Sequence, residues 1–305
     1  MMLEPKVAKE RAARLSVMSN TLLVVGKLSV GTVMGSVSVI SEGIHSGLDL
    51  VAAVIAWASI RAANKPADEE HPYGHGKIEN VSGTIEAILI FIAAFYIIVE
   101  AGQKFYHAQP VESLGLGALV MGVSAVVNWL VSRHLLTVAK QTESIALEAD
   151  AWHLRTDVYT SLGVLVGLLL IKLTGIAWLD PVVAIIVALM IIRAAYELTK
   201  QSFVDIIDAR LPDAEEQLIR EILQGRSKDF VEFHKLRTRK AGAERHVDLH
   251  LVVYKHMTVQ EVHDLSEEIE SALCGALPNC QVLIHFEPCT PDRCDQCSDC
   301  ENINS

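Results

Sequence analysis

Charged residues are scarce in this sequence: Asp, Glu, Lys and Arg make up 21% of its 305 residues, whereas 51% are hydrophobic. The mean hydropathy is +0.32, and over the first 200 residues long apolar blocks alternate with short polar connectors. A composition this poor in charge excludes an ordinary soluble protein. It favours an integral membrane domain followed by a smaller domain of globular composition.

The sequence also lacks an excess of basic residues: its formal net charge at pH 7 is −11. Acidity of this kind argues against nucleic acid as a partner and suits a surface that handles cations. The HExxH motif of zinc hydrolases is absent, which argues against a membrane metalloenzyme. The polar N-terminus is not followed by a short apolar region with a small-residue cleavage site, so we expect no cleaved signal peptide.

Six apolar stretches are long enough to cross a bilayer as helices, which takes about 20 residues each. We place them near residues 15–35, 39–62, 81–105, 114–136, 146–171 and 178–199. Charged side chains crowd the start of the fifth stretch; a lipid-facing helix could not carry them, but one facing a bundle interior or a water-filled vestibule could. Lys and Arg fall mainly on one side of this arrangement, so the positive-inside rule places both termini in the cytoplasm.

After Lys200 the pattern changes to that of a small α+β domain. Amphipathic and alternating segments predict, in order, a helix, two strands, a helix and a strand near residues 212–223, 230–239, 245–254, 258–275 and 281–287. This α-β-β-α-β order is typical of a ferredoxin-like or metallochaperone-like sandwich. We therefore divide the chain into a membrane domain (1–204), a soluble domain (205–288) and a cysteine-containing tail (289–305).

Two matching tetrads lie in or beside apolar stretches, His45 to Asp49 and His153 to Asp157. On a helix, residues four apart project from the same face, so each tetrad is a two-pronged clamp. Two imidazoles and two carboxylates can close a tetrahedral site, and this donor set suits Zn²⁺ better than Ca²⁺ or Mg²⁺. The same groups bind protons, so metal and protons compete for them. The alternative is a helix cap or charge pairing, because HxxxD alone is a weak motif.

The connector between the second and third stretches holds a second candidate site. Asp68, His71 and His75 could converge on one cation, and a site with three ligands would leave a coordination position open. The alternative is a polar turn whose histidines meet water or phosphate.

A third candidate site is spread over the soluble domain and consists of His234, His250, His263, His285 and Glu287. Its spacing is weak evidence, because distant histidines need a fold to bring them together. His285 and Glu287 share one face of a predicted strand, since they are two residues apart.

Other polar residues allow more than one interpretation. Cys289, Cys294, Cys297 and Cys300 could form a thiolate site for Zn²⁺ or Cu⁺, or belong to an irregular tail with reduced thiols. Lys27, Glu86 and Glu100 lie within or near the apolar stretches, where we expect snorkelling or interhelical pairing rather than a direct transport role.

Together, the paired tetrads, the DEEHPYGHGK connector and the α-β-β-α-β domain resemble the cation diffusion facilitator family, from about Leu15 to Pro288. The resemblance implies a proton-coupled exporter of zinc and related divalent metals. It implies a homodimer in the lipid bilayer, in a bacterial inner membrane, whose cytoplasmic domains pair. It further implies a transport site at the tetrads, a loop site at Asp68, His71 and His75, and a regulatory zinc site in the soluble domain.

Two residues depart from the family pattern. Many bacterial relatives have aspartate at the position of His45, and the pattern with two histidines is associated with a preference for zinc over cadmium. Glu287 stands where aspartate is usual, which could alter a two-metal geometry. Two alternative functions remain, a membrane-anchored metal sensor and an exporter of Fe²⁺, Cd²⁺ or Mn²⁺.

Overall fold

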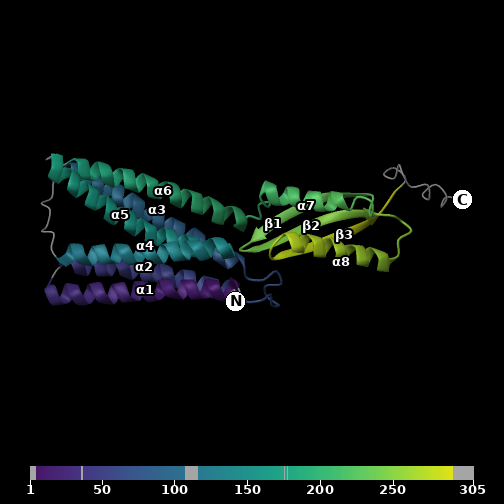
Figure 1. Ribbon diagram of the computed structural model, residues 1–305, viewed down its shortest axis with the longest axis horizontal. Helices are drawn as coiled ribbons and strands as arrows, with labels where there is room; N and C mark the ends of the chain where they lie inside the picture. Colours follow the sequence, from purple (N-terminus) through teal and green to yellow (C-terminus); the bar gives the residue numbers. More distant parts are fainter. Residues whose placement is uncertain (1–4, 36, 107–115, 175, 177, 291–305) are drawn as a thin grey trace. The chain divides into compact units, whose positions relative to one another are not determined.

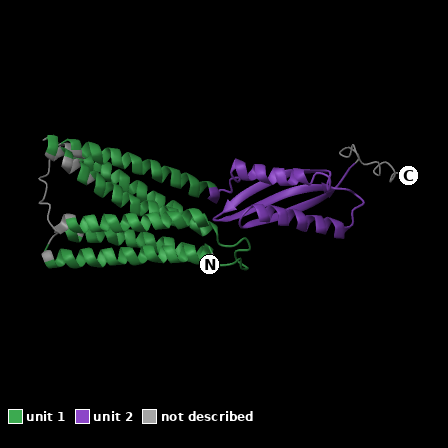
Figure 2. Cartoon of the chain, viewed as in Figure 1, with its two compact units in different colours: residues 1–204 green, residues 205–305 purple. Residues whose placement is uncertain are grey.

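The computed structural model describes the chain except for residues 1–4, 36, 107–115, 175, 177 and 291–305. The chain divides into two compact units, Met1–Val204 and Asp205–Ser305, which Figure 2 shows in different colours. Unit 1 is helical, and unit 2 combines two helices with a small sheet (Figure 1).

The described residues of unit 1 form six long helices, each overlapping one predicted apolar stretch. Their bounds are α1 (Pro5–Met34), α2 (Val37–Ala63), α3 (Lys77–Tyr106), α4 (Leu116–Thr142), α5 (Ile145–Thr174) and α6 (Leu179–Ile206). Several helices extend beyond the apolar stretches; α1, for example, begins ten residues before Leu15. The backbone hydrogen bonds of a helix do not require apolar side chains, so hydropathy underestimates helix length.

Five of these helices, α1, α2, α3, α4 and α6, are long and apolar enough to cross a membrane, counting described residues alone. Helix α5 is as long as α1 and α3, with 30 residues, but its side chains are described only in part. The sixth membrane span therefore stays a prediction, while the helical membrane architecture is confirmed.

Close packing of α1 against α2 fixes the helix that carries the first tetrad. A Cβ atom on Gly31 would lie 2.8 Å from the Ile40 side chain, and one on Gly43 would lie 2.7 Å from that of Leu28. Larger residues at either glycine would push the two helices apart. Gly35, in the turn between the helices, has a φ of +64°, which glycine adopts without strain.

Unit 2 has the predicted element order, with α7 (Asp213–Gly225), β1 (Glu232–Ala241), β2 (Glu244–Val253), α8 (Val259–Ala276) and β3 (Cys280–Pro288). The sheet order is β1-β2-β3, in which β1 pairs antiparallel with β2 and β2 pairs parallel with β3. The crossover through α8 makes the parallel pairing possible. The predicted α+β fold is confirmed.

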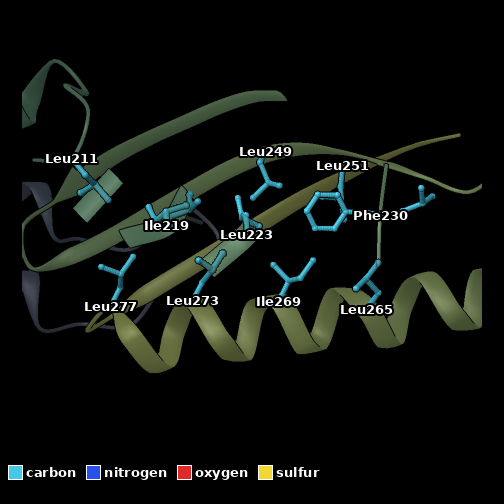
Figure 3. Packing of buried hydrophobic residues seen from close by; sticks show 12 residues of the cluster. Leu211, Ile219, Leu223, Phe230, Leu249, Leu251, Leu265, Ile269, Leu273 and Leu277 are labelled. Atoms are coloured by element: carbon cyan, nitrogen blue, oxygen red, sulfur yellow. The ribbon is translucent and has the colours of Figure 1, made fainter. Parts of the chain in front are cut away.

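Both helices of unit 2 pack against the same face of the sheet. Figure 3 shows Leu265, Ile269 and Leu273 of α8 directed toward Leu249 and Leu251 of β2. Ile219 and Leu223 of α7 belong to the same buried cluster. Because successive strand residues point to opposite faces, His250 of β2 lies on the face away from the helices.

Candidate metal sites

The two tetrads of unit 1 lie opposite one another on α2 and α5, and their residues pair reciprocally. His153 Nε2 lies 3.2 Å from Asp49 Oδ1, and His45 Nε2 lies 4.0 Å from Asp157 Oδ1. Ligand atoms of His45, Asp49 and Asp157 all lie within 4.8 Å of one another. His153 joins this group through Asp49, so four donors of the kind that Zn²⁺ accepts converge between two helices.

A cavity of about 260 Å³ in unit 1 gives access to the tetrads. All six helices contribute to its lining, which includes His45, Asp49 and Asp157. The Asp49 side chain is 5% exposed, whereas that of His45 is 57% exposed. Three of the four donors therefore line the cavity, and His45 is the most exposed of them.

Polar residues around the tetrads add to what the ligand motif alone indicates. Lys27 of α1 donates a hydrogen bond to Ser46 (2.8 Å) and lies 3.5 Å from Glu42 of α2. This contact is interhelical pairing, one of the two roles expected for Lys27. Asn128 of α4 donates a hydrogen bond to Asp157 (3.3 Å), a contact that no sequence spacing indicated.

The connector between α2 and α3 brings its three candidate ligands together. Asp68 lies 3.2 Å from His71 Nδ1 and 3.4 Å from His75 Nε2, and the two imidazole rings are 4.4 Å apart. The backbone N–H of His71 also donates to the Asp68 carboxylate (2.7 Å), which holds the pKa of Asp68 below its ordinary value. Gly74, with a φ of +79°, permits the turn between the two histidines. These residues could hold one cation.

In unit 2, histidines of three adjacent strands form a row on the face away from the helices. His234 pairs in register with His250, and His250 with His285. Glu287 lies 2.7 Å from His250 Nδ1 and 3.4 Å from His234 Nε2, and the His285 ring is 4.5 Å from that of His250. The hydrogen bond with His250 holds the pKa of Glu287 below its ordinary value. We call His234, His250, His285 and Glu287 the strand cluster.

A β-bulge aligns His234 with this cluster. The pairing of β1 with β2 shifts between His234 and Arg237, so two residues of β1 stand opposite Leu249 of β2. Lys235, inside the bulge, has a φ of +50°. The extra residue places His234 and Arg237 on the same face despite their odd spacing.

Comparison with known proteins covers both units. Residues 13–207 match the cation efflux transmembrane domain, and residues 211–289 match the cytoplasmic domain of cation efflux proteins. The chain belongs to the cation diffusion facilitator family. It is therefore an integral membrane protein of a family of cation-efflux transporters.

Full-length relatives support this membership. An uncharacterized transporter of Synechocystis sp. is 36% identical over 262 residues, which cover 86% of this chain and 84% of the relative. The cation-efflux pump FieF of Serratia proteamaculans is 28% identical over 291 residues, covering 94% and 96%. A solved structure of CzrB, a candidate zinc transporter, matches a shorter part of the chain with 42% identity. The match covers 26% of this chain and 99% of the CzrB chain, with a TM-score of 0.26.

One of the five candidate residues of unit 2 lies apart from the strand cluster. His263 is exposed on α8, on the opposite side of the sheet, where it lies 3.3 Å from Glu267. A single chain therefore brings together four of the five candidate residues of unit 2. A ligand role for His263 stays a prediction that requires a second subunit.

The cysteine site of the tail lies mostly outside the described residues, which include Cys289 but not Cys294, Cys297 or Cys300. Cys289 is buried, and its thiol accepts a hydrogen bond from the Lys255 backbone (3.4 Å). Cys289 is thus packed into the edge of unit 2, where one thiol by itself makes no metal site.

Proposed function

We propose that this protein is a Zn²⁺/H⁺ antiporter that exports zinc from the cytoplasm by alternating access. The observation that carries the proposal is the reciprocal pairing of two His–Asp tetrads on α2 and α5 beside a cavity. Histidine nitrogen and carboxylate oxygen in fourfold coordination suit Zn²⁺.

Charge balance supports coupling to protons. With neutral imidazoles and ionised aspartates, the tetrads carry two negative charges, which one divalent cation neutralises. Without metal, the same charges lie in a region of low dielectric constant, where protonation is the other way to neutralise them. Proton binding lowers metal affinity, so exchange of the two ligands follows from one donor set.

The two ends of unit 1 differ in a way that supports alternating access. The α3 residues that line the cavity lie toward the C-terminal end of that helix, from Ile97 to Ala101. The α1 residue that lines it, Lys27, lies near the C-terminal end of α1. At the other end, Lys9 of α1 forms a buried ion pair with Glu79 of α3, which also accepts a hydrogen bond from Ser144. We call the region around Lys9, Glu79 and Ser144 the closed end.

Orientation and assembly extend this proposal. We place both termini and the closed end in the cytoplasm of a bacterial cell, with unit 1 in the inner membrane, because Lys and Arg concentrate on that side. The cytoplasmic domain match supports a homodimer. The strand cluster would bind regulatory Zn²⁺ that stabilises the dimer and favours transport when zinc is abundant.

The test is metal flux into proteoliposomes under an imposed pH gradient. Purified wild-type protein should move Zn²⁺ against protons, and Asp49→Ala should lose this flux because it removes a buried ligand. Glu197→Gln is the matched control, since Glu197 lies on α6 and pairs at the surface with Arg193. Undiminished Zn²⁺ flux in Asp49→Ala would refute the transport site. Parallel assays with Cd²⁺, Fe²⁺ and Mn²⁺ test the alternative cargoes.

A further inference from the structure

Two buried acidic side chains of unit 1 belong neither to the tetrads nor to the closed end, Glu86 of α3 and Asp150 of α5. Both are 0% exposed. No hydrogen-bond partner for any of their four carboxylate oxygens occurs in the described part of the chain. Their chain neighbours Ala87 and Ala149 pack in one buried cluster, and the charge of Asp150 acts on Glu86. The snorkelling or pairing expected for Glu86 does not occur among the described residues, because no basic group reaches it.

Buried polar side chains from two helices surround this pair. The Ser16 hydroxyl of α1 reaches toward Asp150, and the Ser82 hydroxyl of α3 toward Glu86. Ser16 and Ser82 are 0% and 3% exposed, and neither hydroxyl makes a hydrogen bond of normal length and angle in the described part of the chain. A buried polar cluster with so many unpaired groups is costly unless it binds a proton or a counterion.

Electrostatics limits what this buried cluster can bind. An isolated ionised carboxylate in a dry interior is strongly unfavourable, and two adjacent carboxylates cannot both stay ionised without a counterion. Among the described residues, the charged groups that act on Asp150 are His153 and Asp49 of the tetrads. The charged group that acts on Glu86 is Asp150 itself. With acids predominating among these neighbours, the lowest-energy state places at least one proton on the pair.

The pair lies between the tetrads and the closed end. Glu86 is nine residues, or about 13 Å, along α3 from its first residue, Lys77. Asp150 precedes His153 by one helical turn on α5, and the α5 residues that line the cavity begin at Asp157. Both acids are therefore in the half of unit 1 that the cavity does not reach.

We propose that Glu86 and Asp150 form a proton-binding site that is occupied while the closed end is closed and is emptied when that end opens. On opening, a carboxylic O–H bond ionises and the proton passes to incoming water, which then solvates the carboxylate. This inference rests on the proposed alternating access and adds a proton site beyond the tetrads. Higher pH on the side of the closed end therefore favours opening.

The first test measures the proton directly, without transport. Infrared difference spectra of the full-length protein in liposomes, wild type minus Glu86→Gln, should contain a protonated-carboxyl band. The Asp150→Asn variant should alter the same band, and Glu197→Gln should not. Both Gln and Asn preserve side-chain shape, and thermal melting of each variant checks folding. Absence of a protonated-carboxyl band from both wild type minus Glu86→Gln and wild type minus Asp150→Asn would mean that neither acid holds a proton and would overturn the proposal.

The second test measures turnover as the pH on the side of the closed end is varied. Wild-type Zn²⁺ flux should rise with that pH, whereas Glu86→Gln, which cannot ionise, should turn over several-fold more slowly with a flatter profile. Zn²⁺ affinity by calorimetry should be unchanged, since no tetrad ligand is altered. An unchanged profile in Glu86→Gln would refute a site that empties on opening. Failure of wild-type protein to exchange Zn²⁺ for protons would instead refute the antiport, and the infrared result would still stand or fall separately.

Discussion

The tetrads and the strand cluster contain the same types of donor group, imidazole and carboxylate, in different surroundings. In unit 1 the carboxylate of Asp49 is 5% exposed and lies between helices, whereas in unit 2 that of Glu287 is 28% exposed on a sheet. A dry carboxylate must be neutralised by metal or proton, while one in contact with water can stay charged alone. Under the proposed function, a buried carboxylate suits a transport site, which must always hold either metal or a proton. An exposed carboxylate suits a site that senses the metal concentration.

The largest expected difference is between loss of a buried and of an exposed carboxylate. Asp49→Asn should lower Zn²⁺ flux at least about 100-fold, because loss of an outer-shell partner alone costs a metal site about 10–100-fold and Asp49 is a buried proposed ligand. Glu287→Gln should leave flux at saturating Zn²⁺ nearly intact and shift only the zinc concentration that gives half the maximal rate. Proteoliposome flux over a range of Zn²⁺ concentrations checks both. Equal losses in the two variants would abolish the distinction drawn between the sites.

A smaller effect is expected from a change of donor atom within the tetrads. His45→Asp should preserve transport but lower the ratio of Zn²⁺ to Cd²⁺ flux by about tenfold, because imidazole nitrogen helps to set the preference among metals. His45 is the tetrad residue most open to the cavity, so the substitution should disturb packing little. Competition flux with both metals in one assay measures the ratio. An unchanged ratio would show that His45 does not determine selectivity.

The pH dependence of folding should reveal the exposed carboxylate of the strand cluster. The pKa of Glu287 is lower in the folded protein than its ordinary value. Its contact with His250 therefore stabilises unit 2 fully at any pH above that ordinary pKa. The contribution disappears as pH falls through the folded pKa. The difference in Tm between wild type and Glu287→Gln should therefore be present near neutral pH and vanish in acid. A difference that grows in acid would contradict this sign.

The smallest effect is expected for the tail. Deletion of residues 291–305 should leave Zn²⁺ flux unchanged, because the proposed transport and regulatory ligands all precede this segment. Deletion from Cys289 onward should lower the Tm slightly, since Cys289 is buried and its N–H donates to the Val253 carbonyl (2.9 Å). A lower flux after the shorter deletion would indicate a metal role for the cysteines.

The sequence predicted the architecture well because its signals are local. Apolar length located the helices of unit 1, and the alternation in unit 2 located β2 near residues 245–254, where it runs from Glu244 to Val253. The tetrad spacing indicated which residues share a helix face. Their convergence across two helices rests on packing of α2 against α5, which spacing alone does not encode.

Contacts between distant segments were less accessible. The pairing of His234 with His250 depends on strand register, so the spacing of these residues in the sequence was weak evidence for a shared site until the family resemblance supported it. The burial of Glu86 beside Asp150 was not foreseen, since hydropathy does not report which face of a helix meets another helix. Asn128 beside Asp157 likewise gave no sequence signal, as asparagine is common on helices.

The β-bulge in β1 allows the strand cluster to form at the residue spacing of this chain. A regular β1 with the same spacing would place His234 and Arg237 on opposite faces of the sheet and turn one of them toward the helix-packed side. Removing one residue between them would instead leave regular alternation, with His234 still opposite His250. Counting residues across the bulge therefore helps to decide which relatives need a bulge to share this site.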